Sequence, residues 1–188
     1  YWNDRVNGKS NYQLANDAAK INELHDIKKI PKNILMLHIF KDSPYGLIDK
    51  KRIFSDYTDW LNYTLKIISE SDETWGIKFH PSALRWGEDS YRIFHEFLEY
   101  NFDSKLPKNI VLIKNQYSNY DIFKTARRLV TFWGTCHIEA ASFGIKPIVI
   151  RDVQLSFYNK NLVFKPKKLE DYKSKLLTKD LNFFKLNR

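Results

Sequence analysis

Short apolar runs of strand length alternate along this chain with longer stretches in which apolar residues recur at helical spacing. The run from Ile34 to Ile39 is nearly continuous, which is typical of a strand buried on both faces. Further strands are predicted at 75–80, 110–113, 129–132 and 147–150, and a shorter apolar stretch follows at 162–164. Helices are predicted at 12–24, 54–68, 89–100, after Ser118, at 135–143 and at 168–177.

Two of the predicted helices carry sequence signals at their ends. Ser118 is followed three residues later by Asp121, which is the spacing of a capping box, so a short helix is predicted to begin there. Gly144 follows the apolar helix at 135–143, and glycine is the residue that most often ends a helix in the left-handed conformation.

Strands and helices that alternate with short connections are typical of βαβ units. We therefore predict an α/β fold, with a doubly wound parallel sheet of about five to six strands and helices on both faces, as in a Rossmann-like domain. With the strand order 3-2-1-4-5, the first, second and fourth strands lie side by side in the middle. The loops after these strands would then line one crevice, which is where such sheets bind ligands.

This pattern divides the chain into three parts. Residues 1–32 are predicted to form an N-terminal helical lead-in, residues 33–165 the Rossmann-like domain, and residues 166–188 a C-terminal helical tail. No internal repeat or low-complexity linker separates them.

Composition and charge restrict the class of protein. Of the 188 residues, 43% are hydrophobic and 15% aromatic, which is enough for a core and argues against disorder. The formal net charge of +9 favours an anionic partner, such as a nucleotide, a phosphorylated lipid, an anionic membrane surface or a nucleic acid. An AT-rich genome, which enriches Lys, Asn and Ile, would explain the same charge without any partner.

The cysteine content, the lengths of the apolar runs and the first residues of the sequence further restrict the cellular compartment and the class of protein. The only cysteine, Cys136, excludes an internal disulfide framework and a cysteine-based zinc site, and it indicates a reducing compartment. No apolar run approaches the roughly 20 residues that span a bilayer. The sequence starts at Tyr1 without an initiator methionine or a signal peptide, so we expect a part of a longer protein.

The second predicted strand ends in residues that can bind an anion. Side chains alternate along a strand, so Lys78 and His80 share one face while Ile77 and Phe79 share the other. Pro81 has no amide hydrogen, so pairing stops there and leaves His80 at the edge of the sheet. The imidazole can donate a hydrogen bond or a proton to an anionic oxygen. The alternative is a purely structural histidine.

The fourth predicted strand leads into a second candidate site. Gly134 permits close backbone approach, and Thr135 is a good N-cap for the helix that follows. The unpaired amides at that helix start can bind a phosphate. Glu139 lies one turn after Thr135 on the same face, where a carboxylate could bind ribose hydroxyls. In the structural alternative, Glu139 pairs with a nearby Lys or Arg.

These motifs together resemble the donor-binding half of GT-B glycosyltransferases. The resemblance is carried by Lys78-Phe79-His80-Pro81, Thr131-Phe132-Trp133-Gly134-Thr135, Glu139, Gly144 and Pro147, with Phe54–Trp60 and Ser156–Tyr158 in support. It covers about residues 33–160, and it is closest to the group that builds bacterial capsule and other surface polysaccharides and includes Kdo transferases.

The resemblance implies a role for each matched residue. His80 would contact the donor phosphate and assist departure of the nucleotide, and hydrogen-bond donors aimed at that developing charge would stabilise the transition state. Gly134 and Thr135 would hold the phosphate, and Glu139 would bind the ribose. The other predicted donor-binding residues are Lys78 and Pro81 beside His80, Asp42 after the first strand, and Lys114 and Asn115 near the base.

The chain departs from the family pattern in two respects. Relatives tend to have paired serines where Gly134-Thr135 stands, so one hydroxyl is missing. Relatives also carry the acceptor site and catalytic base in the N-terminal GT-B domain. We expect those residues to be absent from this chain, so we expect nucleotide binding without turnover by this chain alone.

No Asp-x-Asp stands in a plausible metal-binding loop, so we predict no metal and no cofactor besides the nucleotide-sugar co-substrate. A CMP-activated sugar is one candidate for that co-substrate.

Three other functions are compatible with parts of the sequence. CDP-polyol phosphotransferases of the teichoic-acid type share a similar fold and a His-Pro motif, but have a serine-rich turn where this chain has TFWGT. The charge favours a nucleic-acid-binding module, but Lys and Arg are dense only at Lys165–Lys168 and at Arg127-Arg128, so no nucleic-acid partner is expected. The third is a non-catalytic Rossmann-like protein, and the absence of a G-x-G-x-x-G motif argues against a dinucleotide cofactor.

The resemblance also implies partners and a location. We expect a nucleotide-activated sugar, a glycan or glycolipid acceptor, and the missing N-terminal domain. The expected location is cytoplasmic, and the basic tail favours peripheral contact with the anionic inner membrane.

Overall fold

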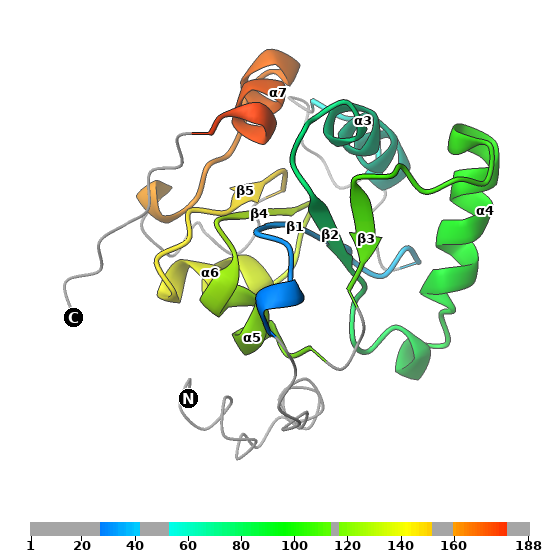
Figure 1. Ribbon diagram of the computed structural model, residues 1–188, viewed down its shortest axis with the longest axis horizontal. Coiled ribbons are helices and arrows are strands. Elements are labelled where there is room, and N and C mark those ends of the chain that lie inside the picture. Colours follow the sequence, from blue (N-terminus) through cyan, green and yellow to red (C-terminus); the bar gives the residue numbers. More distant parts are fainter. Residues whose placement is uncertain (1–26, 42–52, 114–116, 152–159, 180–188) are drawn as a thin grey trace.

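Five strands form one parallel sheet in the order β3-β2-β1-β4-β5, with β1 at its centre (Figure 1). This computed structural model describes residues 27–41, 53–113, 117–151 and 160–179. The strands are β1 (Asn33–Met36), β2 (Trp75–Lys78), β3 (Ile110–Leu112), β4 (Arg128–Thr131) and β5 (Ile148–Val149). The predicted fold class and strand order are confirmed.

Helices lie on both faces of this sheet (Figure 1). The α-helices in the described ranges are α3 (Tyr57–Ser69), α4 (Ser90–Phe102), α5 (Asn119–Thr125), α6 (Cys136–Ser142) and α7 (Leu169–Leu177). Short 3-10 helices are η1 (Ile27–Lys29), η2 (Leu84–Trp86) and η4 (Lys160–Leu162). The helix predicted at 12–24 lies outside the described residues.

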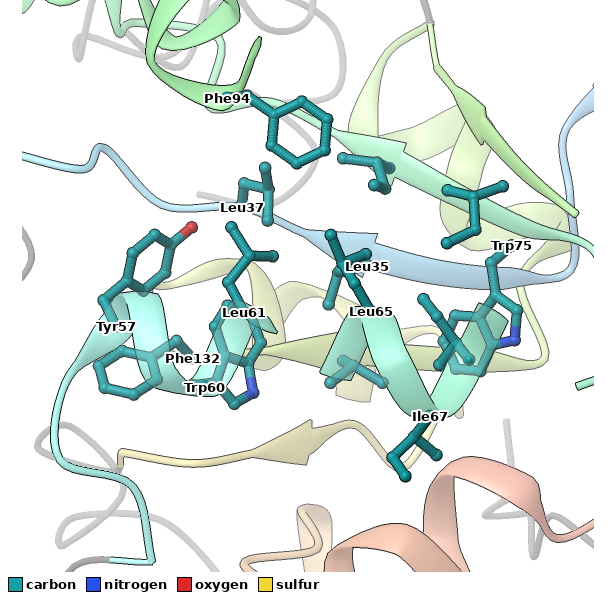
Figure 2. Close-up of a cluster of buried hydrophobic side chains, with 14 of the residues drawn as sticks. Leu35, Leu37, Tyr57, Trp60, Leu61, Leu65, Ile67, Trp75, Phe94 and Phe132 are labelled. Atoms are coloured by element: carbon teal, nitrogen blue, oxygen red, sulfur yellow. The ribbon is translucent and has the colours of Figure 1, made fainter. Parts of the chain in front are cut away.

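The larger core cluster packs between the sheet and the helices α3, α4 and α7. Leu35 of β1 and Leu37, just after the strand, point into it beside Leu61 and Leu65 of α3 (Figure 2). Asp56 caps α3 by accepting a hydrogen bond from the Asp59 amide at 2.8 Å. Each fully buried leucine of this kind contributes about 1.5–3 kcal/mol to folding, so this face supplies much of the stability.

The opposite face of the sheet packs against α5 and α6. Its cluster contains Ile34 and Met36 from β1, which alternate with the residues that face α3. The capping box at Ser118 and Asp121 is confirmed, since the Ser118 hydroxyl accepts from the Asp121 amide and the Asp121 carboxylate accepts from the Ser118 amide. Gly144 follows α6 with a φ of 83°, as the sequence predicts.

Helix α7 is joined to α3 by a buried polar contact. The Tyr172 hydroxyl accepts a hydrogen bond from the Trp60 indole nitrogen at 2.8 Å and lies 2.7 Å from the Thr64 hydroxyl. Tyr172 and Leu176 belong to the larger core cluster. Part of the predicted C-terminal tail therefore packs with the core, while the boundary at residue 165 stays a prediction.

An ion pair between the buried Arg128 and the partly exposed Glu73 lies at the amino end of the sheet, away from the candidate site. Arg128, only 2% exposed, donates to the Glu73 carboxylate at 2.7 Å and to the Asn33 side-chain oxygen at 2.9 Å. It also donates to the Thr178 carbonyl, and its guanidinium lies 5.3 Å from the ring of Trp75. Arg128 therefore does not contribute to an exposed basic patch, which weakens the nucleic-acid interpretation.

In the described ranges, no helix has both the length and the apolar character needed to cross a membrane.

Candidate functional site

The loops that follow β2, β1 and β4 meet at the carboxyl edge of the sheet. The ring of His80, after β2, lies 5.6 Å from the ring of His38, after β1, measured between centroids. The ring of His38 lies 6.3 Å from that of Trp133, after β4. His38 therefore stands between the two predicted halves of the site, and the sequence-based expectation that these loops share one crevice agrees with this arrangement.

His80 is held in a turn that leaves its other ring nitrogen as a donor. Pairing of β2 with β1 ends with the bond from the Leu37 amide to the Lys78 carbonyl at 2.8 Å. The chain then turns, and the Ser82 amide donates to Nδ1 of His80 at 3.2 Å. Because Nδ1 accepts, the neutral ring carries its proton on Nε2.

Gly134 opens the turn after β4. Its φ of 126° is one that residues with a Cβ rarely adopt, so glycine is required for its backbone conformation. A Cβ placed there would lie 3.6 Å from Cδ2 of His38, which is ordinary contact, so backbone conformation and not space selects glycine. The turn therefore brings the β4 loop directly against His38.

Thr135 stands at the N-cap position of α6, but it does not cap the helix in the predicted way. Its backbone is helical, with φ −69° and ψ −15°, and its side chain makes no capping hydrogen bond. An effective N-cap side chain needs an extended backbone to reach back to the second or third amide. Instead, the buried His137 donates from Nδ1 to the carbonyl of Gly134. The Thr135 hydroxyl is exposed and makes no capping hydrogen bond. Its contact with a phosphate stays a prediction.

Glu139 is buried and joins α6 to α5. Its Oε2 accepts from the Asn119 side-chain amide at 3.1 Å. Its backbone amide bonds the Thr135 carbonyl, which confirms the predicted one-turn separation. The role of Glu139 at a ribose stays a prediction.

Lys78 lies beneath the candidate site and links β2 to the start of α5. Its Nζ donates to the Tyr117 carbonyl at 2.8 Å. Ile77 and Phe79 point into the opposite cluster, so the predicted alternation of faces is confirmed. Burial lowers the pKa of Lys78 from 10.5 to about 8, although the nearby Asp121 carboxylate raises it in part.

The lowered pKa of Lys78 predicts a specific pH dependence of stability. Between about pH 8 and 10.5 the unfolded chain binds more protons than the native chain, so the Lys78 contribution to the free energy of unfolding rises with pH. We expect Lys78→Met to stabilise the fold relative to the wild type at pH 7, and this advantage to shrink by up to about 1.4 kcal/mol per pH unit across the window. Urea unfolding from pH 7 to 10 measures the difference, and a difference constant with pH would contradict the prediction.

Glu88 is a residue of this region that the motifs do not reveal. Its side chain is fully buried and accepts from the backbone amides of Phe40 and Lys41, at 3.0 and 2.7 Å, and from the Ser90 hydroxyl. Lys41 in turn donates from Nζ to the Gly87 carbonyl at 3.1 Å. The carboxylate thus ties the loop after β1 to the segment that follows the His-Pro turn.

Sequence reasoning also missed His38 and Arg151. His38 was counted within an apolar strand, although it lies beyond the last residue of β1. The guanidinium of Arg151, after β5, lies 5.1 Å from the ring of Trp133. The signal for both was their place in the register, two positions after a strand end at the carboxyl edge.

The other predicted site residues are only partly described. Pro81 is exposed in the turn that follows β2, while Asp42, Lys114 and Asn115 lie outside the described residues. Among the described residues, no group of three or more His, Cys, Asp or Glu side chains could hold a metal ion.

Comparison with known proteins identifies the fold. No protein-family model matches the chain, and no curated protein sequence matches it. The structure is similar to that of UDP-GlcNAc 2-epimerase from Methanocaldococcus jannaschii, solved in complex with UDP-GlcNAc and UDP, with a TM-score of 0.50 and 15% sequence identity. The alignment covers 96% of this chain and 48% of the epimerase chain, so this chain spans about half of that length. The chain has the fold of one Rossmann-like half of a GT-B-type protein.

Proposed function

We propose that this chain is the donor-binding half of a nucleotide-sugar-dependent glycosyltransferase that builds a bacterial surface polysaccharide, of the capsule or lipopolysaccharide type. The observation that carries the proposal is the placement of His80, whose Nε2 is the donor nitrogen of the neutral ring, beside His38 and the Gly134 turn. The GT-B-like fold supports a nucleotide-sugar ligand at this edge of the sheet.

In this proposal, the bond between the anomeric carbon of the sugar and the donor phosphate oxygen breaks, and the nucleotide leaves with the electron pair. His80 donates from Nε2 to that oxygen as negative charge develops, while the backbone amides near Gly134 and Thr135 face the same phosphate. Glu139 would bind the ribose. An acceptor hydroxyl forms the new bond to the anomeric carbon, and its proton goes to a base in the other GT-B half.

The domain organisation follows from the same proposal. Residues 33–165 would bind the donor, and the acceptor site would lie in the other half of the GT-B pair. The acceptor would be a glycan or glycolipid at the inner face of the membrane, which the basic charge of the chain favours.

A nucleotide panel tests the proposal. Thermal unfolding with CMP, CDP, UDP, GDP and a short oligonucleotide should show stabilisation by at least one nucleotide. A ligand at 100 times its dissociation constant stabilises the native state by about 2.7 kcal/mol. We expect His80→Ala to abolish most of that shift, because the donor to the phosphate is lost.

The matched control is His95→Ala, since His95 is exposed on α4 and pairs with a surface glutamate, Glu99. This variant should keep the full nucleotide response. Binding should also persist in EDTA, as the proposal needs no metal. Salt-sensitive binding of the oligonucleotide without any nucleotide response would reject the proposal in favour of a nucleic-acid-binding module.

A further inference from the structure

Four side chains occupy one register position beyond the carboxyl edge of the sheet. His80, His38, Trp133 and Arg151 each stand two residues after the last residue of β2, β1, β4 and β5. The last residues of these four strands are register partners of one another. We call these four residues the edge row, because they continue one line of the sheet across four adjacent strands.

The edge row is also continuous in space. Its successive members are separated by 5.6 Å between His80 and His38, and by 6.3 Å between His38 and Trp133. The guanidinium of Arg151 then lies 5.1 Å from the Trp133 ring. The Arg151 amide bonds the Phe132 carbonyl at 2.8 Å, so the backbone of this last member is still held to the β4 segment.

The chemistry of the edge row fits an anion. A guanidinium is always charged and presents a fork of donors that matches phosphate oxygens, and it is fixed here against an aromatic face. His80 can donate from Nε2, since its Nδ1 accepts from the Ser82 amide. Nδ1 of His38 lies 3.3 Å from the Ile39 carbonyl, so His38 donates to an anion from Nε2 when both of its ring nitrogens are protonated. Gly134, next to Trp133, has no side chain that could cover the edge row beside His38.

The length of the edge row distinguishes between anions. Neighbouring strands lie about 4.7–4.9 Å apart, so β2 and β5 are separated by three such spacings, or about 14 Å. Hydrogen bonds to a phosphate oxygen extend only about 2.7–3.2 Å. A single phosphoryl group can therefore contact the middle of the row or one end of it. Two linked phosphoryl groups can use more of its donors.

We propose that the edge row binds the diphosphate of a nucleoside diphosphate donor, with His38 and Arg151 as two phosphate-contacting residues in addition to His80. Trp133 holds the Arg151 guanidinium toward the ligand. This inference rests on the proposed function and makes it more specific, because it selects a nucleoside diphosphate sugar over a CMP-activated sugar.

Calorimetric titration of the whole chain in EDTA tests this selection. The probes are UDP, CDP and GDP, the matching monophosphates UMP, CMP and GMP, and inorganic pyrophosphate. For the preferred base, we expect the diphosphate to bind at least about tenfold more tightly than the monophosphate. His38→Asn and Arg151→Gln should each weaken diphosphate binding by about 10- to 100-fold, as expected for a lost hydrogen bond to a charged group. Their effect on the monophosphate should be smaller.

Matched controls are His95→Asn and Arg92→Gln, both exposed on α4, which should leave all affinities unchanged. Circular dichroism establishes that each variant is folded, and Arg151→Gln carries the test alone if His38→Asn does not fold. Equal affinity for mono- and diphosphates, or unchanged diphosphate affinity in folded variants, would overturn the edge-row proposal while the nucleotide-binding proposal stands. A wild-type chain that binds no nucleotide and no pyrophosphate would overturn both.

Discussion

Arg128→Ala is expected to lower the free energy of unfolding by about 2–4 kcal/mol, because the buried guanidinium is lost together with its hydrogen bonds, and a hydrogen bond to a charged group contributes about 1.5–3 kcal/mol. The substitution leaves the Glu73 carboxylate and the Asn33 side-chain oxygen without their guanidinium donor at 2.7 and 2.9 Å. It also removes the cation from the face of Trp75. Since natural domains are stable by about 5–15 kcal/mol, the variant should be largely unfolded at 37 °C or melt well below the wild type.

The neighbouring arginine provides the matched control. Arg127 has the same charge and lies one position earlier, but its side chain is exposed. Arg127→Ala should change the free energy of unfolding by less than about 0.5 kcal/mol, as is usual for surface positions. Urea denaturation of both variants measures the difference. Equal stabilities of the two variants would mean that the Arg128 ion pair contributes nothing to the fold.

Glu88→Ala is expected to cost about 3 kcal/mol or more, because it leaves two backbone amides and one hydroxyl without their shared acceptor. Each buried donor left unsatisfied costs about 1–3 kcal/mol. The amides belong to Phe40 and Lys41, and the next residue is the predicted donor-binding Asp42. We therefore expect weaker nucleotide binding as well, measured in the same titrations once the variant is shown to be folded.

One further variant separates charge from shape at Glu88, and a second, on α4, is the surface control. Glu88→Gln keeps the length of the side chain but replaces one accepting oxygen with an amide donor, so an intermediate loss of stability is expected. Glu96→Ala removes an exposed carboxylate that pairs with Arg92 on α4, and should cost less than about 1 kcal/mol. A loss for Glu88→Ala no larger than that for Glu96→Ala would show that the carboxylate does not hold the β1 loop.

Local sequence signals predicted the elements well, because they depend on residues close together in the chain. The alternation of Ile77 and Phe79 against Lys78 follows from strand geometry alone, and it is confirmed. The capping box at Ser118 and Asp121 needs only a three-residue spacing, and it is also confirmed. The sheet order then followed from the general preferences of alternating α/β folds.

Contacts between distant segments were the ones that sequence reasoning missed. Glu88 accepts from amides 48 and 47 residues away, and nothing around it in sequence indicates that role. Arg128 was counted with Arg127 as a basic spot, although its partners Asn33 and Glu73 bury it. Thr135 has the right residue type for a cap, but the backbone that capping requires is set by the Gly134 turn and cannot be inferred from residue type.

The hydrogen bond between Trp60 and Tyr172 has a consequence for synthesis of the chain. The hydroxyl that accepts from the Trp60 indole is translated 112 residues later, which is roughly 6 to 20 seconds at common elongation rates. Until then the Trp60 indole lacks its buried acceptor. In the same way, β1 cannot pair with β4 before β4 has been synthesised. The core cluster that contains Trp60 therefore cannot be completed until α7 has been synthesised.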